Sequence, residues 1–232
     1  MTVIGIRLSP DFSRTGLWDF FLRVVLGLYF GWNGLSAADM QIRSVFNEGF
    51  EALPLSRLLE ILSDMTGTLF MLSVAILMVT RRRRVAASAG FYPRMVAMLG
   101  SFLFAFLVPF LTKQALPPAL NLFSISLMLA GSVLAATVLM FLGRSFSIFP
   151  EAGRLVVTGP YRFVRHPLYA TEFIALFGLA LQYRPWPAMA AFLIQLYFLA
   201  ERIRIEEEIL QKTFPEYKIY AARVELLLPG IW

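Results

Sequence analysis

The feature that most constrains this chain is a run of 24 residues without a charge, Ala119–Leu142. A helix needs ~20 mostly apolar residues to cross the hydrocarbon core of a bilayer, so this run is long enough to span it. Of the 232 residues, 58% are hydrophobic and only 16% are charged, whereas a soluble domain carries about 25% charged residues. The sequence therefore predicts an integral membrane protein.

Further apolar segments make the chain polytopic. Three are long enough to cross the membrane alone, and two shorter ones are joined by the sequence RPWP; the segments are Leu17–Ala38, Leu58–Thr80, Met95–Thr112, Leu168–Tyr183 and Trp186–Ala200. Because proline breaks a helix, Pro185 and Pro187 predict a tight hairpin between the two short segments. We predict an all-α fold with about six transmembrane helices, including this short C-terminal hairpin.

Basic residues predict how the chain is oriented, since cytoplasmic loops carry the excess of Lys and Arg. The loops richest in these residues follow the second segment, the fourth segment and the hairpin: Arg81–Arg84, then Arg144, Arg154, Arg162 and Arg165, then Arg202, Arg204, Lys212, Lys218 and Arg223. We therefore expect both termini and the active site to be cytoplasmic, with Lys113 and Arg184 on the far side. Residues 1–90 would form an N-terminal helix pair with a cytoplasmic arginine loop, and residues 91–232 the functional core.

Composition also excludes several kinds of site. The chain has no cysteine, which rules out thiolate metal sites and cysteine nucleophiles. Its net charge of +6 is typical of loops that face anionic lipid. There is no glycine-rich phosphate loop, no interleaving of aromatic and basic residues, and no histidine pair with metal-ligand spacing. We expect no metal and no nucleic-acid partner.

Two polar clusters flank the short hairpin, Gly143–Tyr169 and Glu201–Trp232. The first contains the stretch GPYRFVRHPLY, in which His166 is the only histidine of the chain. A hairpin brings its two ends together, so Arg165 and His166 should lie close to the start of the second cluster. Topology alone thus predicts cations, an imidazole and carboxylates beside an apolar, membrane-facing chamber.

These motifs carry a family resemblance. GPYRFVRHPLY, followed by RIRIEEEILQKTFPEYKIYAARV, resembles the isoprenylcysteine carboxyl methyltransferase family, which is itself similar to the phospholipid methyltransferases. The second motif has the family's spacing at Arg202, Ile203, Glu206, Glu207, Leu210 and Phe214. It departs from the pattern where Pro215 replaces a common glycine and Tyr217 arrives one residue early. The resemblance covers residues 143–232 and does not include the first two apolar segments.

The resemblance implies a methyltransferase that takes its methyl group from S-adenosylmethionine and acts on a lipophilic or lipidated acceptor. It implies that the cofactor is bound by Gly159, Tyr161, His166, Pro167, Tyr169 and Glu206, and that Arg202, Glu207 and Arg165 are catalytic. An arginine can hold a carboxylate through two hydrogen bonds, and we expect Arg202 to orient an anionic acceptor. A C-terminal helix within Glu201–Tyr220 would cap the cytoplasmic entrance. The hairpin and Ala119–Leu142 would form opposite walls, with a lateral entrance from the membrane.

The acceptor atom stays open at this stage. A prenylcysteine-like carboxylate is the first expectation, because it is ionised at neutral pH and needs no general base. A phospholipid amine would need one, with Glu207 or His166 as candidates, and a small hydrophobic thiol or hydroxyl is a third acceptor. Two other classes are an NADPH-dependent sterol-type reductase, against which the Glu206–Glu207 pair argues, and a non-catalytic membrane scaffold.

Two further acidic residues differ in context. Glu172 lies three residues after Tyr169 within an apolar run, and ionisable residues at membrane depth are functional candidates by default. A position at the membrane interface would explain it equally well, so its role stays open. Glu208 is expected on a solvated helix face with partners four residues away.

Overall fold

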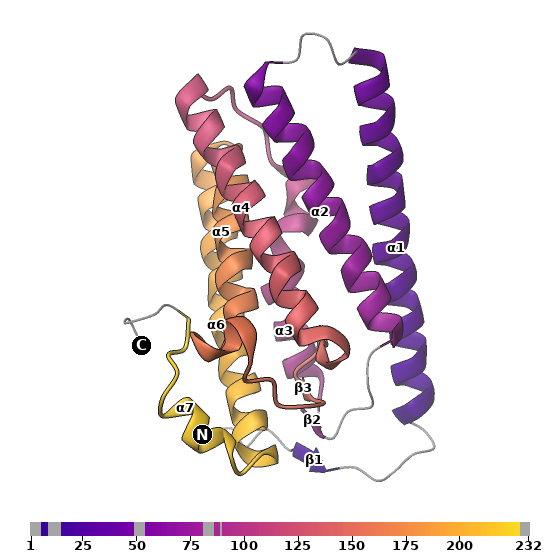
Figure 1. Ribbon diagram of the computed structural model, residues 1–232, viewed down its shortest axis with the longest axis vertical. Helices are drawn as coiled ribbons and strands as arrows, with labels where there is room; N and C mark the ends of the chain where they lie inside the picture. The colour runs from indigo at the N-terminus through magenta and orange to yellow at the C-terminus, as the bar shows by residue number, and fades with distance from the viewer. Residues whose placement is uncertain (1–5, 9–14, 49–53, 81–85, 89, 228–232) are drawn as a thin grey trace.

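The computed structural model describes residues 6–8, 15–48, 54–80, 86–88 and 90–227 (Figure 1). The predicted arginine loop, Arg81–Arg84, lies outside the described residues. Long helices dominate the rest: α1 (Thr15–Glu48), α2 (Leu55–Thr80), α3 (Phe91–Leu107), α4 (Pro118–Leu142), α5 (Pro167–Leu181) and α6 (Pro185–Thr213). A short helix, α7 (Tyr217–Ala221), follows, and the 3-10 turns are η1 (Val108–Phe110), η2 (Gly143–Ser145) and η3 (Gly159–Arg162). The all-α prediction is confirmed.

Prolines mark where several helices begin. α4, α5 and α6 each start with proline at the first helical position, where its fixed φ is already helical and its missing N–H costs no hydrogen bond. Two helices are longer than the apolar segments that predict them. α1 continues beyond Ala38 to Glu48, and α6 runs without a break through the polar residues after Ala200 to Thr213, just before Pro215.

Hydrophobic surface indicates where the molecule resides. Two of the described helical stretches are long and apolar enough to cross a membrane, Leu55–Thr80 and Pro118–Ser145. Large apolar side chains also point outward, such as Trp32, Ile76 and Leu193, each more than half exposed. Soluble monomers rarely expose contiguous apolar surface on this scale, so the helices belong in a bilayer. The protein is an integral membrane protein; the number of crossings and their orientation stay predictions.

The helices pack against one another in pairs, and a glycine lies where one pair approaches most closely. α1 packs on α2, α2 on α4, α4 on α5, and α3 on α6. α4 and α5 approach very closely, since a Cβ at Gly131 would lie 2.5 Å from the backbone nitrogen of Ala175. Ser124 Oγ also donates to the carbonyl of Gly178 at 2.8 Å. α5 and α6 are joined by the tight turn that the sequence predicts, but each packs mainly against another helix.

Three short strands from separate connecting segments form a small sheet at one end of the bundle. β1 (Ile6–Leu8), β2 (Ala86–Ser88) and β3 (Glu151–Ala152) form an antiparallel sheet in the order β1-β2-β3. The sequence does not predict this sheet, because strands of two or three residues are too short to show alternation. Figure 1 shows the sheet and α7 at the same end of the bundle. This end contains the described residues of both polar clusters.

The opposite end is closed by backbone contacts between two connections. Lys113 and Tyr183 form an isolated antiparallel bridge, and the backbone N–H of Arg184 donates to the carbonyl of Thr112 at 2.9 Å. Lys113 and Arg184 therefore share the end away from the two polar clusters, as the predicted topology requires. The domain boundary at residue 90 stays a prediction.

Candidate active site

The corner before α5 is shaped by a glycine and a proline. Gly159 has φ of 62°, and a Cβ there would lie 2.3 Å from the ring of Phe141 at the end of α4. Only glycine fits both this backbone conformation and this close approach. Pro167 then begins α5, with His166 as its N-cap residue. Gly159 and Pro167 therefore shape the backbone of the RHP motif, and neither lines a cavity described below.

The C-terminal segment holds the same corner from its other side. The backbone N–H groups of Arg165 and His166 donate to the carbonyls of Glu225 at 2.8 Å and Leu226 at 3.0 Å. The Arg165 guanidinium donates to the carbonyl of Ala221 at 2.7 Å. The RHP motif is thus fixed to the end of the chain as well as to α5, which orients its side chains.

A polar cavity of about 110 Å³ lies between this corner, the polar end of α6, α7 and the segment 145–156. The corner, α6 and α7 contribute eight ionisable side chains to its lining: Tyr161, Arg165, His166, Tyr169, Arg202, Glu206, Tyr217 and Tyr220. Glu151 and Arg154 line it from the segment 145–156. Six of these eight are residues that the sequence predicts for the site. The hairpin therefore brings the two motifs together, as the topology argument expects.

Glu206 is the meeting point of one half of this site. Its Oε1 accepts hydrogen bonds from Tyr169 Oη at 2.6 Å and from Arg202 Nε at 3.1 Å. The Arg202 guanidinium lies 4.9 Å from the centre of the Tyr169 ring, a cation–π distance. It also donates to Ser101 Oγ and to the carbonyl of Ser147. Arg202 is 3% exposed, so its charge is compensated inside the protein.

Glu207 is the meeting point of the other half. Its Oε1 lies 2.8 Å from His166 Nε2 and 3.5 Å from Arg165 Nε, and it accepts a hydrogen bond from Tyr217 Oη. Burial alone would raise the pKa of Glu207, but the bonds from His166 and Tyr217 and the nearby Arg165 leave it below its ordinary value. The carboxylate is therefore ionised, and His166 carries a hydrogen on Nε2. Glu207 itself lines neither cavity, and its predicted catalytic role stays a prediction.

Two tyrosines of the cap were not assigned roles from the sequence. Burial, followed by the hydrogen bond to Glu207 and then by the charge of Glu207, raises the pKa of Tyr217 and keeps its hydroxyl protonated as a donor. Tyr220 donates to the carbonyl of Tyr161, and burial raises the pKa of Tyr220 to about 12. Tyr217 had a signal in the motif, whereas Tyr220 had none. The partners Ser101 and Ser147 lie far from α6 in the sequence and could not be found from spacing.

A second cavity, apolar and of about 340 Å³, lies deeper among the helices. Residues of α1 to α6 line it together with Phe146 and Ile148 of the segment 145–156. The aromatic side chains in this lining are Tyr29, Phe30, Phe70, Phe102, Phe106 and Phe146. Phe146, Leu168 and Arg202 line both cavities, so the two meet at these residues. Residues of α4, α5 and α6 all line this cavity, and α4 packs directly on α5. That α4 and the hairpin form opposite walls, with a lateral entrance between helices, stays a prediction.

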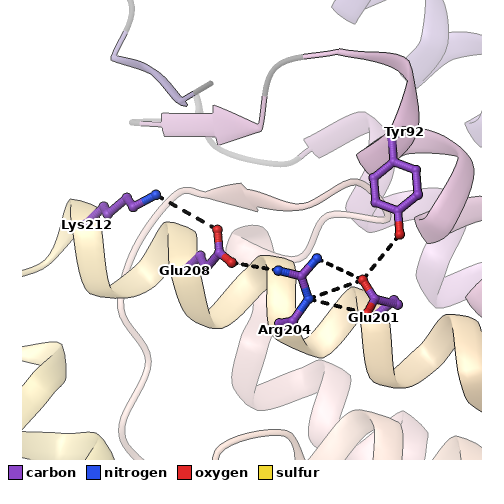
Figure 2. A network of polar contacts seen from close by, with 5 residues as sticks. All are labelled: Tyr92, Glu201, Arg204, Glu208 and Lys212. Atoms are coloured by element: carbon purple, nitrogen blue, oxygen red, sulfur yellow. Dashed lines mark hydrogen bonds and ion pairs between the residues drawn. The ribbon is translucent and has the colours of Figure 1, made fainter. Parts of the chain in front are cut away.

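The solvated face of α6 carries a separate network, shown in Figure 2. Arg204 pairs with Glu201 and with Glu208, both at 2.8 Å, and Tyr92 Oη donates to Glu201 at 3.3 Å. Lys212 lies 3.9 Å from Glu208. Glu208 is thus on the exposed face with partners four residues away, as the sequence indicates, and it lines neither cavity.

Comparison with known proteins finds one family model that matches the part of the chain that contains the site. Residues 119–217 match the phospholipid methyltransferase family. The stretch includes α4, α5 and α6 and ends at Tyr217, so it contains the corner and both glutamates. The resemblance indicated by the two motifs is confirmed for this part of the chain.

Two curated relatives match parts of the chain. Protein-S-isoprenylcysteine O-methyltransferase B of Arabidopsis thaliana is 32% identical over 116 residues, 47% of this chain and 59% of that protein. The nickel-cobalt-cadmium resistance protein NccN of Alcaligenes xylosoxydans xylosoxydans is 35% identical over 83 residues, 35% of this chain and 38% of that protein. The matches thus span less than two thirds of either relative.

Proposed function

We propose that this protein is a membrane-embedded methyltransferase that transfers a methyl group from S-adenosylmethionine to a lipophilic acceptor. The observation that carries the proposal is the junction of a polar and an apolar cavity at Phe146, Leu168 and Arg202. A water-soluble cofactor and a membrane-dissolved acceptor need two such compartments that touch where the methyl group passes. The match to the phospholipid methyltransferase family supports the same reaction.

The polar cavity has the donor set that S-adenosylmethionine requires. Arg165 offers a cation for the carboxylate of the methionine part, and its buried Nε has no hydrogen-bond partner among the described residues. Glu206 offers an acceptor for the ammonium or for ribose hydroxyls. Tyr161 and Tyr169 offer aromatic surface, and Tyr169 stacks on His166 at 5.5 Å. These residues fit the cofactor, and they are the ones that would hold it.

The volume of the polar cavity is small for a cofactor of this size. At about 110 Å³ it is smaller than the ~300 Å³ at which ligand pockets usually begin. Binding a cofactor of this size would therefore move part of the lining outward. The segment 145–156 and α7 are the candidates, because they lie outside the packed helices α4 and α5.

The bound cofactor would supply an electrophilic methyl group on a sulfonium. The protein then mainly has to align the acceptor with that group, which is where orientation contributes most to rate. The corner fixed by Gly159, Pro167 and the C-terminal segment gives this rigidity. Arg202 lies at the junction and, with Glu206, holds Tyr169 in the polar cavity. Glu207 contacts Arg165 and His166 from behind this cavity.

The acceptor atom separates two versions of the proposal. A prenylcysteine-like carboxylate would bind Arg202, and the Arabidopsis relative carries that substrate class in its name. Three of the five guanidinium N–H groups of Arg202 already have partners in Glu206, Ser101 and Ser147, which leaves two for an acceptor. The family match instead brings a phospholipid amine into consideration.

The test is a transfer assay with purified protein in lipid vesicles and S-adenosylmethionine labelled in the methyl group. We expect label in the organic phase when a prenylcysteine or a lipophilic amine is present. The variant His166→Ala should lose most of this transfer, and Glu208→Gln should keep it. Equal loss in both variants, or transfer that does not depend on His166, would contradict the assignment of the polar cavity.

A further inference from the structure

Another polar cavity lies at the end of the bundle away from the proposed active site. It has a volume of about 310 Å³, which reaches the ~300 Å³ at which ligand pockets usually begin. The first turns of α2 and α4, the connection after α3 and the end of α5 line it. Figure 1 shows the starts of α2 and α4 at the end of the bundle opposite the small sheet. Among the described residues, this end cavity shares none of its lining with the polar cavity and only Met128 with the apolar one.

Charges of both signs line the end cavity in equal numbers, with Arg57 and Lys113 against Glu60 and Asp64. Arg57 is already engaged, since it pairs with Glu60 at 3.1 Å and donates to Ser44 Oγ at 2.7 Å. Asp64 and Lys113 are both exposed to solvent, so both are charged at neutral pH. They act on one another across the cavity, but within the described parts of the chain neither side chain makes a hydrogen bond or an ion pair. The cavity therefore offers one carboxylate and one ammonium that lack a direct partner.

Amide groups at the same cavity have unused hydrogen-bonding capacity. Gln182 Nε2 donates to the thioether sulfur of Met128 at 3.5 Å, and sulfur is a weak acceptor. Gln114 Nε2 donates to the carbonyl of Leu181 at 3.0 Å. Among the described residues, the side-chain oxygens of both glutamines and the whole amide of Asn121 have no hydrogen-bond partner. These groups suit a polar ligand with both donors and acceptors nearby.

Charge decides which class of ligand suits the end cavity. A simple anion would bind Lys113 but would bring a like charge towards Asp64, and a simple cation would do the reverse. Like charges placed together cost several kcal/mol at an interface. A zwitterion satisfies both side chains at once, with its anionic group on Lys113 and its cationic group on Asp64.

The surface beside the cavity indicates where such a zwitterion comes from. Leu62 of α2 and Leu120 of α4 are exposed, and each is next in sequence to a residue that lines the cavity, Ser63 and Asn121. In a bilayer these leucines contact acyl chains. A phospholipid is thus able to place its chains on this surface and its head group in the cavity.

We propose that the end cavity binds a zwitterion in which a phosphate is joined to an ammonium, the chemistry of a phospholipid head group. The phosphate contacts Lys113, and the ammonium contacts Asp64. This ligand is not the methyl acceptor, because the end cavity and the polar cavity lie at opposite ends of the bundle. It joins α2 to the connection after α3 and stabilises the folded protein by mass action. The proposal does not depend on the proposed function.

The test is calorimetric titration of the full chain in a nonionic detergent, with detergent alone as the blank. The probes are dihexanoylphosphatidylcholine, dihexanoylphosphatidylglycerol and free phosphocholine. A choline head group has no N–H left to methylate, so its binding does not report a methyl acceptor. Wild type should bind the choline lipid at least about tenfold more tightly than the glycerol lipid, which brings a negative charge and no cation to Asp64.

Four variants separate the two charges. Asp64→Asn should bind both lipids with similar affinity, whereas Lys113→Gln should weaken both, because both carry the phosphate. Asp64→Glu keeps the charge and should keep the preference, so it serves if Asp64→Asn does not fold. Asp39→Asn is the matched control, since Asp39 pairs with Arg43 on an exposed face of α1, and it should bind as wild type does.

The outcomes are distinct. Free phosphocholine that binds at least about tenfold more weakly than the choline lipid assigns the site to a membrane lipid, and equal affinity assigns it to the free zwitterion. A glycerol lipid that binds as tightly as the choline lipid, or a choline preference that survives in Asp64→Asn, would overturn the proposal. S-adenosylhomocysteine is titrated into the same samples. If it fails to bind while the choline preference is present, the methyltransferase assignment fails and this proposal stands.

Discussion

The polar end of α6 carries the same ion pair twice, on two faces. Arg202 pairs with Glu206 on the inner face at 3.1 Å, and Arg204 pairs with Glu208 on the outer face at 2.8 Å, each four residues apart. The inner side chains are 4% and 19% exposed, whereas the outer ones are 48% and 36% exposed. In the sequence the two pairs look alike.

The difference lies in what surrounds each pair. Exposed pairs contribute about 0–1 kcal/mol because water and salt screen them. Removing one partner of a buried pair leaves an uncompensated charge and costs about 3–5 kcal/mol. The inner pair also meets Tyr169, Ser101 and Ser147 at the junction of two cavities, whereas the outer pair extends only to residues such as Glu201 and Lys212. Burial and convergence, and not spacing, separate a site from a solvated face.

The largest effect should come from removing the inner arginine. Arg202→Ala leaves Glu206 unpaired beside Tyr169, so we expect a loss of stability of about 3–5 kcal/mol and methyl transfer reduced by orders of magnitude. Arg202→Lys should rescue little, because a lysine cannot reproduce three directed N–H contacts. The matched control, Arg204→Ala, should cost no more than about 1 kcal/mol. Unfolding in detergent followed by circular dichroism measures both, and equal costs would remove the distinction between the faces.

The next effect concerns the two glutamates of these pairs. Glu206→Gln should weaken binding of S-adenosylhomocysteine by about 1–3 kcal/mol, the value of a hydrogen bond to a charged group. Glu208→Gln should leave that affinity unchanged. Calorimetric titration of both variants gives the comparison. Loss of binding in Glu208→Gln alone would mean that the outer face holds the cofactor.

Low pH should separate the inner glutamate Glu207 from the outer glutamate Glu208 by their effects on stability. The pKa of Glu207 is lower in the folded protein than in the unfolded chain, so its contribution is present above about pH 4.3, the unfolded value. That contribution is lost as the pH falls towards the folded pKa. Wild type should therefore lose stability more steeply between about pH 5 and pH 3 than Glu207→Gln does. Thermal unfolding across this range tests it, with Glu208→Gln expected to follow wild type.

The smallest effect should come from the edge of the outer network. Tyr92→Phe removes one hydrogen bond to Glu201 at 3.3 Å on the surface. Such exposed substitutions usually change stability by less than about 0.5 kcal/mol. A thermal unfolding midpoint within error of wild type is the expected result. A large shift would show that the outer network fixes α3 to α6.

Much of the fold could be predicted because hydrophobicity is a strong local signal. Apolar runs and prolines indicated each of the six long helices, and the tight turn before α6 followed from Pro185 and Pro187. The long extension of α1 beyond Ala38 was missed because its polar residues weaken the apolar pattern that marked the segment. The small sheet was missed because its strands are only two or three residues long.

The sequence predicted the residues of the site that belong to the two motifs on either side of the hairpin. It did not predict the residues that other segments contribute. Six predicted residues line the polar cavity, while Gly159, Pro167 and Glu207 shape or hold it from behind. Ser101 and Ser147 contact Arg202 from distant segments, and no spacing rule could reveal them. Glu172 could be noticed as a charge in an apolar run, but only packing showed that it lines the apolar cavity.

The account depends on the polar cavity taking S-adenosylmethionine, and calorimetric titration of purified wild type tests this most directly. S-adenosylhomocysteine should bind at a single site, and NADPH should give no binding heat. The affinity for S-adenosylhomocysteine should fall in His166→Ala, whose imidazole bonds to Glu207 at 2.8 Å, and not in Glu208→Gln. Binding of NADPH without binding of S-adenosylhomocysteine would contradict the account and favour a reductase.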